Sequence, residues 1–155
     1  MEPITVKNKD MSRYLEIGRT CACGSLRRAS RLITQVYDNF LKPSGLKITQ
    51  FIMLMSVKIL GPITITRLAQ KLLMDRTTCT RNLKGLQEKN FINFEQSEDR
   101  RMKNIVLTDQ GNEILEQAIP LWEKAQNFLL DKVGENQMAS LVKDLSRTVS
   151  IVRKK

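Results

Sequence analysis

The chain has 155 residues, a formal net charge of +10 and 41% hydrophobic residues, enough for one domain with a modest core. It contains no histidine and no glycine-rich phosphate loop, so we expect neither an enzyme nor a bound cofactor. No apolar run approaches the ~18 residues of a membrane span, and no signal peptide is recognisable. We therefore expect a cytoplasmic protein without a membrane partner, whose three cysteines are reduced thiols.

The positive charge lies in residues 1–108, because residues 109–155 contain equal numbers of acidic and basic side chains. A basic body favours a polyanionic partner such as nucleic acid or an anionic membrane surface. Charge does not choose between these partners, and a solvated basic surface without any partner is the third possibility.

The chain begins with two predicted helices. Apolar residues at a spacing of three and four predict the first over residues 17–41, and Pro43 and Gly45 end it. The second is predicted over residues 50–60, with Thr49 as its N-cap.

Two short helices are predicted next. After an extended link at Pro62 and Ile63, the first covers residues 65–72. The second covers residues 76–89 and has Asp75 as its N-cap. Two short helices joined by a few residues, the second with a polar outer face, predict a helix-turn-helix.

A β-hairpin is predicted after the helix-turn-helix. Residues 91–95 and 104–107 alternate like strands, and residues 96–103 form a charged loop between them. Two helices followed by a hairpin with a basic tip is the element order of a winged helix. The predicted fold class is therefore mainly α (α+β), a winged helix-turn-helix with a two-stranded wing.

Two long helices are predicted at the end of the chain, over residues 109–130 and 135–152. Pro120 lies inside the first of them, where we expect a kink because the apolar pattern continues beyond it. Both helices carry more apolar surface than a small wing can cover. This surplus predicts a homodimer formed by the N- and C-terminal helices.

The predicted second helix of the helix-turn-helix carries the side chains expected to contact DNA. A recognition helix needs short polar or basic side chains near its N-terminus to reach base edges in the major groove. An ordinary solvated helix face is the alternative interpretation. The predicted contacts are Arg76, Thr77, Thr78, Thr80, Arg81 and Lys84 on the helix, and Arg100, Arg101 and Lys103 in the hairpin.

The loop of the hairpin, which forms the wing, contains a predicted ion pair. An arginine at a wing tip can enter the minor groove, where the negative potential is deepest when the groove is narrow. Asp99 lies two residues before Arg101, so we expect its carboxylate to pair with that guanidinium and hold it in position. A surface ion pair without a role in DNA binding is the alternative.

From about Arg19 onward the chain resembles the MarR family of bacterial regulators. The most specific element is Asp-x-Arg, five residues, then Leu-Thr-x-x-Gly, which here comprises Asp99, Arg101, Leu107, Thr108 and Gly111. The resemblance implies a homodimer that binds a palindromic operator in double-stranded promoter DNA. It also implies an effector pocket where the dimerisation helices meet the DNA-binding lobe.

These observations predict one domain over residues 1–155, with a DNA-binding lobe at about 46–108. The dimerisation helices are expected at about 11–41 and 109–155.

The three cysteines are expected to differ. Cys79 falls on the apolar face of its helix, so a buried thiol is favoured. Cys23 begins a Cys-x-x-Leu-x-x-x-Ser-Arg stretch that resembles the organic-hydroperoxide-sensing branch of the same family. Tyr37 falls where that branch places one of two tyrosines that support the reactive thiolate, and Arg27 occupies the other position. Unreactive cysteines are the alternative, and Cys21-x-Cys23 without a second pair is too weak for a metal site.

The sequence thus predicts a sequence-specific DNA-binding transcriptional regulator, a repressor released by a small-molecule effector. Two alternatives stay open: oxidant sensing through Cys23, and a winged helix used for protein–protein contact.

Overall fold

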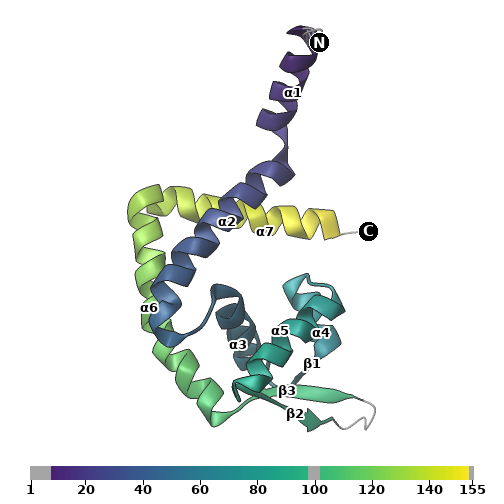
Figure 1. Cartoon of the computed structure of the whole chain (residues 1–155), viewed down its shortest axis with the longest axis vertical. Helices are drawn as coiled ribbons and strands as arrows, with labels where there is room; N and C mark the ends of the chain where they lie inside the picture. Colours follow the sequence, from purple (N-terminus) through teal and green to yellow (C-terminus); the bar gives the residue numbers. More distant parts are fainter. Residues whose placement is uncertain (1–7, 98–101, 154–155) are drawn as a thin grey trace, which may run out of the picture. The chain divides into compact units, whose positions relative to one another are not determined.

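The computed structural model describes residues 8–97 and 102–153 (Figure 1). The chain forms two compact units, Met1–Val36 and Tyr37–Lys155, which are treated separately below. None of the helices in the described ranges is both long enough and apolar enough to cross a membrane.

The first unit consists of α1 (Asn8–Thr20) and the first part of α2 (Ala22–Leu41). The predicted helix over residues 17–41 is therefore two helices, which meet at Cys21. Both backbone groups of Cys21 still make helical hydrogen bonds, to the carbonyl of Ile17 at 3.0 Å and from the N–H of Ser25 at 3.1 Å. The sequence does not predict most of α1, because polar residues at the start of the chain obscure its apolar spacing.

The second unit begins with the end of α2, the short helix η1 (Lys42–Ser44) and α3 (Ile48–Leu60). The predicted start of α3 at residue 50, with Thr49 as N-cap, is wrong by two residues. Asp38 supplies the reason, because its carboxylate accepts the N–H of Ile48 at 2.8 Å from ten residues away. The Gln50 side chain also accepts the N–H of Lys47 at 3.1 Å, so Asp38 and Gln50 together take the place of the expected Thr49 cap.

The predicted helix-turn-helix is confirmed as α4 (Ile65–Leu72) and α5 (Arg76–Glu88). Thr64 caps α4 by accepting the N–H of Arg67 at 3.3 Å. The apolar faces of both helices enter the main core, whose most deeply buried members include Met53, Leu54, Leu68, Leu83, Leu86, Ile92, Ile105 and Leu115.

The predicted hairpin is confirmed as β2 (Ile92–Gln96) and β3 (Lys103–Leu107), which pair antiparallel. The expected extended link forms a third strand, β1 (Ile63–Thr64), so the sheet order is β1-β3-β2. Ile63 pairs with Ile105, and both side chains are buried. Burial of this apolar pair explains why a two-residue link joins the sheet.

The two long helices are confirmed as α6 (Asp109–Val133) and α7 (Glu135–Arg153). α6 continues through Pro120 without a break, and its ribbon changes direction along its length (Figure 1). Trp122 of α6 stacks near Tyr37 and Phe51, with ring centroids 6.5 Å and 6.2 Å apart. These contacts hold the end of α2 and α3 against α6.

The start of α6 is fastened to the residues that precede β2. The Thr108 hydroxyl donates to the carbonyl of Asn90 at 2.6 Å, and the Thr108 N–H donates to the carbonyl of Phe91 at 3.2 Å. The same hydroxyl accepts the N–H of Gly111 at 2.9 Å. A Cβ at Gly111 would lie 1.9 Å from the Phe91 carbonyl oxygen, so only glycine fits there. We call this contact the α6 joint.

We expect Gly111→Ala to lower the free energy of unfolding by about 2–3 kcal/mol, because the added methyl overlaps backbone atoms. Gly85→Ala is the matched control, since Gly85 also lies in a helix and a Cβ there meets nothing within 4 Å. That control should raise stability by roughly 0.5–1 kcal/mol. Urea denaturation measures both changes, and equal stabilities of the two variants would contradict the packing argument.

Candidate nucleic-acid interface

Asp75 determines where α5 begins. Its carboxylate accepts the Thr78 hydroxyl at 2.6 Å and the Thr78 N–H at 2.8 Å. These hydrogen bonds, the hydroxyl first, hold the pKa of the Asp75 carboxyl below its ordinary value. Below this cap, Cys79, Leu83 and Leu86 bury the inner face of α5.

The outer face of α5 is polar and basic. Five of the six helix residues predicted to contact DNA are exposed and recur at helical spacing, so the structure brings them together on one face: Arg76, Thr77, Thr80, Arg81 and Lys84. Thr78 is the exception, because it is half-buried and its hydroxyl donates to Asp75.

Two members of this face have partners within α5. The Thr80 hydroxyl donates to the carbonyl of Arg76 at 2.8 Å, which leaves its methyl group and its lone pairs for a ligand. Lys84 lies 3.8 Å from the carboxylate of Glu88, an exposed pair one turn away that contributes little to stability.

The hairpin forms the second part of the interface. The Ser97 N–H donates to the carbonyl of Met102 at 3.2 Å, which closes the hairpin below its tip. Lys103 is exposed at the start of β3. The predicted contacts at Arg100 and Arg101, and their predicted support by Asp99, lie outside the described residues.

Sequence reasoning did not single out the polar face of α4. Thr66, Arg67 and Gln70 are exposed and line a cleft that α4 forms with the hairpin. The sequence did contain a signal for this face: Arg67 follows Thr66 directly and Gln70 comes three residues later, a spacing that places polar side chains on one side of a helix.

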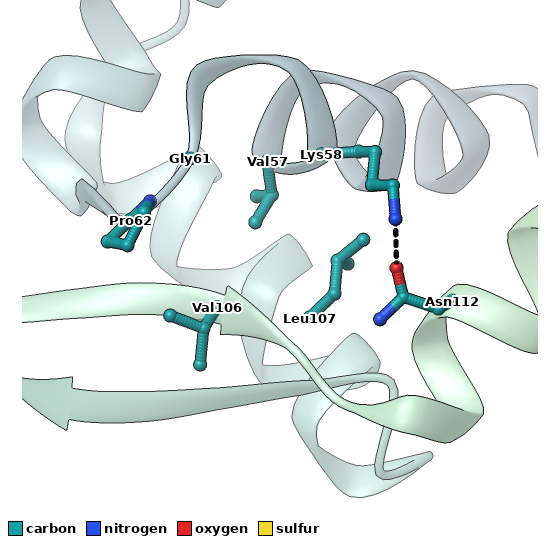
Figure 2. Close-up of a pocket in the computed structure, with 7 residues that line it drawn as sticks. All are labelled: Val57, Lys58, Gly61, Pro62, Val106, Leu107 and Asn112. Carbon is teal, nitrogen blue, oxygen red and sulfur yellow. Dashed lines mark hydrogen bonds between the residues drawn. The ribbon is translucent and has the colours of Figure 1, made fainter.

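A small pocket lies between the end of α3, strand β3 and the start of α6 (Figure 2). Val57, Pro62, Val106 and Leu107 supply apolar walls, and the cavity measures about 160 Å³. At one end, the Lys58 ammonium of α3 donates to the Asn112 side-chain oxygen of α6 at 2.6 Å (Figure 2).

A cavity of this volume is about the size of one that binds a benzene molecule, so an occupant would have to be small. The hydrogen bond joins α3 to α6 directly, and both of its side chains are solvent-accessible.

The predicted burial of Cys79 is confirmed. Burial raises the pKa of its thiol, and the negative charge of Asp75 raises it further, so the reactive thiolate is disfavoured. Cys21 and Cys23 are exposed in the first unit, and the Cys21 sulfur accepts the Gly24 N–H at 3.4 Å.

Tyr37 belongs to the second unit and is half-buried. Its hydroxyl donates to the side-chain oxygen of Gln126, and burial raises the pKa of the phenol. No group of three or more Cys, Asp or Glu side chains in the described ranges is placed to hold a metal ion.

A helix-turn-helix with an exposed basic second helix, followed by a β-hairpin, defines a winged-helix DNA-binding protein. The MarR family model matches residues 46–103. SarZ of Staphylococcus epidermidis (strain RP62A), an HTH-type transcriptional regulator, is 28% identical over 94% of this chain and 93% of SarZ. YwoH of Bacillus subtilis, described as an uncharacterized HTH-type transcriptional regulator, is 30% identical over 74% of this chain and 84% of YwoH.

Solved structures agree with these sequence matches. The M. tuberculosis regulator MosR in complex with DNA is 34% identical, with a TM-score of 0.74 over 86% of this chain and 98% of MosR. A mutant of Escherichia coli MarR complexed with operator DNA has a TM-score of 0.76 over 88% of this chain and 95% of that one, and its 22% identity supports the fold alone. The chain belongs to the MarR family and is a DNA-binding transcriptional regulator.

We expect the Asp75 cap to make stability depend on pH. A carboxyl whose folded pKa is depressed stabilises the fold above its unfolded pKa, and this contribution is lost as pH falls through the folded pKa. Asp75→Asn keeps a capping residue but removes the titration. The free energy of unfolding of the parent, relative to that of Asp75→Asn, should therefore be constant above about pH 5 and fall below about pH 4. Parallel stability profiles in acid denaturation down to about pH 2 would contradict this role of Asp75.

Proposed function

We propose that this regulator is a homodimeric repressor that binds a palindromic operator and is released by a small-molecule effector. The observation that carries the proposal is the exposed basic face of α5 beside a β-hairpin. A repressor of this kind covers promoter DNA and thereby blocks the polymerase.

Base reading is assigned to the first half of α5. Arg76 and Arg81 are exposed, and arginine is the commonest bidentate partner of guanine. Thr77 and Thr80 present methyl groups that suit the thymine methyl. Arg100, Arg101 and Lys103 are assigned to the minor groove and its phosphates, with Asp99 holding Arg101. Lys84, further along α5, is assigned to a phosphate.

Dimer formation is supported by apolar side chains that remain exposed on α7. Leu141, Val142, Leu145, Val149 and Val152 are all at least 38% exposed although they recur at helical spacing. A stripe of this kind is stabilised when it packs against another helix. Two copies of α5 would then reach successive major grooves, which explains a palindromic operator.

Effector release is supported by the position of the α6 joint. The joint connects the hairpin and α5 to α6, one of the proposed dimerisation helices. A ligand that moved α6 would change the distance between the two copies of α5. Half-sites lie about 34 Å apart, so a modest change in that distance disfavours binding to both at once.

We expect Arg76→Ala and Arg81→Ala each to weaken operator binding by ~1–3 kcal/mol and to relax base preference. The duplex used is one that the parent protein selects from a random library, and a scrambled duplex gives the unspecific affinity. Arg147→Ala, which removes the same charge from an exposed position of α7, serves as the control.

Equal losses on selected and scrambled duplexes would show that neither arginine reads sequence. Failure of the parent protein to select any duplex would favour the alternative of a winged helix used for protein contact. Two chains bound per selected duplex would support the dimer, whereas one chain would contradict it.

A second candidate function is oxidant sensing through Cys23. Its thiol is exposed, and Arg27 follows one helical turn later on the same face. A peroxide would oxidise the Cys23 thiolate to a sulfenic acid and leave as the alcohol, and a small thiol would then form a disulfide with release of water. Tyr37, the proposed support for this thiolate, already donates its hydroxyl proton to Gln126.

For this second function, we expect an organic hydroperoxide with a small thiol to release the parent protein from its selected duplex, and Cys23→Ser to stay bound. Cys21→Ser, which changes the other exposed thiol, is the matched control and should release like the parent. Retention of DNA by the oxidised parent would exclude sensing, and release of Cys23→Ser would exclude Cys23 as the sensor.

A further inference from the structure

The end of α5 is held by a defined backbone turn. Asn90 has a left-handed backbone with a φ of 58°, and the Phe91 N–H donates to the carbonyl of Leu86 at 3.0 Å. This Schellman motif satisfies a carbonyl group that the end of a helix otherwise leaves free. The Asn90 side chain also donates to the side-chain oxygen of Gln110 on α6 at 3.1 Å. The last turn of α5 is therefore fastened to α6.

Lys89, the C-cap residue of α5, contacts a different part of the lobe. Its ammonium donates to the carbonyl of Gly45 at 3.2 Å and lies 6.0 Å from the centre of the Phe91 ring. Gly45 is the C-cap of η1, which follows α2 directly, and Phe91 is buried. Lys84 lies five residues earlier, which places the two lysines about 140° apart around the helix axis. The ammonium of Lys89 is thus directed towards the body of the lobe and away from the outer face of α5.

A lysine at the end of a recognition helix has two possible roles. It can bind a DNA phosphate, which adds affinity on every sequence. It can instead hold the helix in place through contacts inside the protein. The carbonyl of Gly45 and the ring of Phe91 engage the Lys89 ammonium on the protein side. These contacts favour the second role.

We propose that Lys89 is a positioning residue for the reading of DNA, which ties the end of α5 to η1 and thereby to the end of α2. The inference rests on the proposed placement of α5 in the major groove. Asn90 fastens α5 to α6, whereas Lys89 fastens it to η1, so two helices together set the angle of α5. Loss of one connection lets that angle vary, and the arginines of α5 then meet base edges less precisely.

The test compares Lys89→Met with the parent protein on the selected and the scrambled duplex. Methionine keeps a flexible apolar stem but removes the charge and the donor. We expect about a three- to tenfold loss of affinity on the selected duplex, as for loss of one hydrogen bond. Affinity for the scrambled duplex and the slope of log K against log salt should match those of Lys143→Met. That control removes the same charge from an exposed position of α7.

Lys84→Met is the matched comparison, because Lys84 lies on the outer face of the same helix and is assigned to a phosphate. It should lose affinity on both duplexes, with a salt slope shallower by about 1. Lys89→Arg keeps a charged donor that can reach the carbonyl and the ring, so it should restore selective binding. Equal losses on both duplexes and a shallower slope for Lys89→Met would identify a phosphate ligand and overturn the proposal.

A second measurement, amide hydrogen exchange of the DNA-free protein, tests the contact itself. The amides at the end of α5 and in η1 should exchange faster in Lys89→Met than in the parent, because local opening no longer breaks the Lys89 contact. Lys84→Met and Lys143→Met should exchange like the parent in both segments. Equal exchange in Lys89→Met and the parent would refute the connection between α5 and η1.

The outcomes separate this inference from the function on which it rests. If Arg76→Ala and Arg81→Ala relax base preference while Lys89→Met binds like the parent, α5 reads DNA as proposed and Lys89 does not position it. If the parent protein selects no duplex, the proposed function fails, and the role of Lys89 in reading DNA fails with it.

Discussion

The contact between Gly111 and the carbonyl of Phe91 is the constraint on which the arrangement of the second unit depends. Because no side chain intervenes, the first turn of α6 lies directly on the backbone between α5 and β2. Thr108 closes the same joint by donating to two consecutive carbonyl groups and accepting one N–H. The position of α6 is therefore set by the residues that follow the end of α5. Any displacement of α6 must either carry α5 along or break these hydrogen bonds.

The exposed basic face of α5, which is proposed to contact DNA, is also held in place by local contacts. Asp75 holds the first turn of α5, while Cys79, Leu83 and Leu86 fix its rotation by burying the opposite face. Arginine and threonine side chains are thereby presented in a fixed register rather than on a mobile loop. The strands of the hairpin are held in the sheet because β3 pairs with both β2 and β1. Two rigid elements on one core suit a surface that must match the fixed spacing of DNA grooves.

Local patterns were sufficient for most of this fold. Helical spacing, capping residues and strand alternation predict α4, α5, β2, β3, α6 and α7 because their stabilising contacts repeat within each element. The predictions failed where distant residues decide the outcome. Asp38 caps α3 from another helix, and β1 exists because Ile63 is buried against Ile105. The exposed face of α5 was predictable from spacing. The cleft between α4 and the hairpin joins segments more than 25 residues apart, so only its α4 side has a signal in the local sequence.

The exposed apolar stripe of α7 affects how the protein should respond to ionic strength. The chain carries a net charge of +10, so like-charged copies repel one another, and dissolved ions screen that repulsion. Apolar burial between copies is not weakened by this screening. Attraction to the DNA polyanion is weakened by the same ions. Salt would therefore favour the proposed self-association through exposed residues such as Leu141 and Val149, and it would weaken binding to DNA. If the proposed dimer forms, the salt dependence of DNA binding reports both effects at protein concentrations near its dissociation constant. At concentrations well above that constant, it reports DNA binding alone.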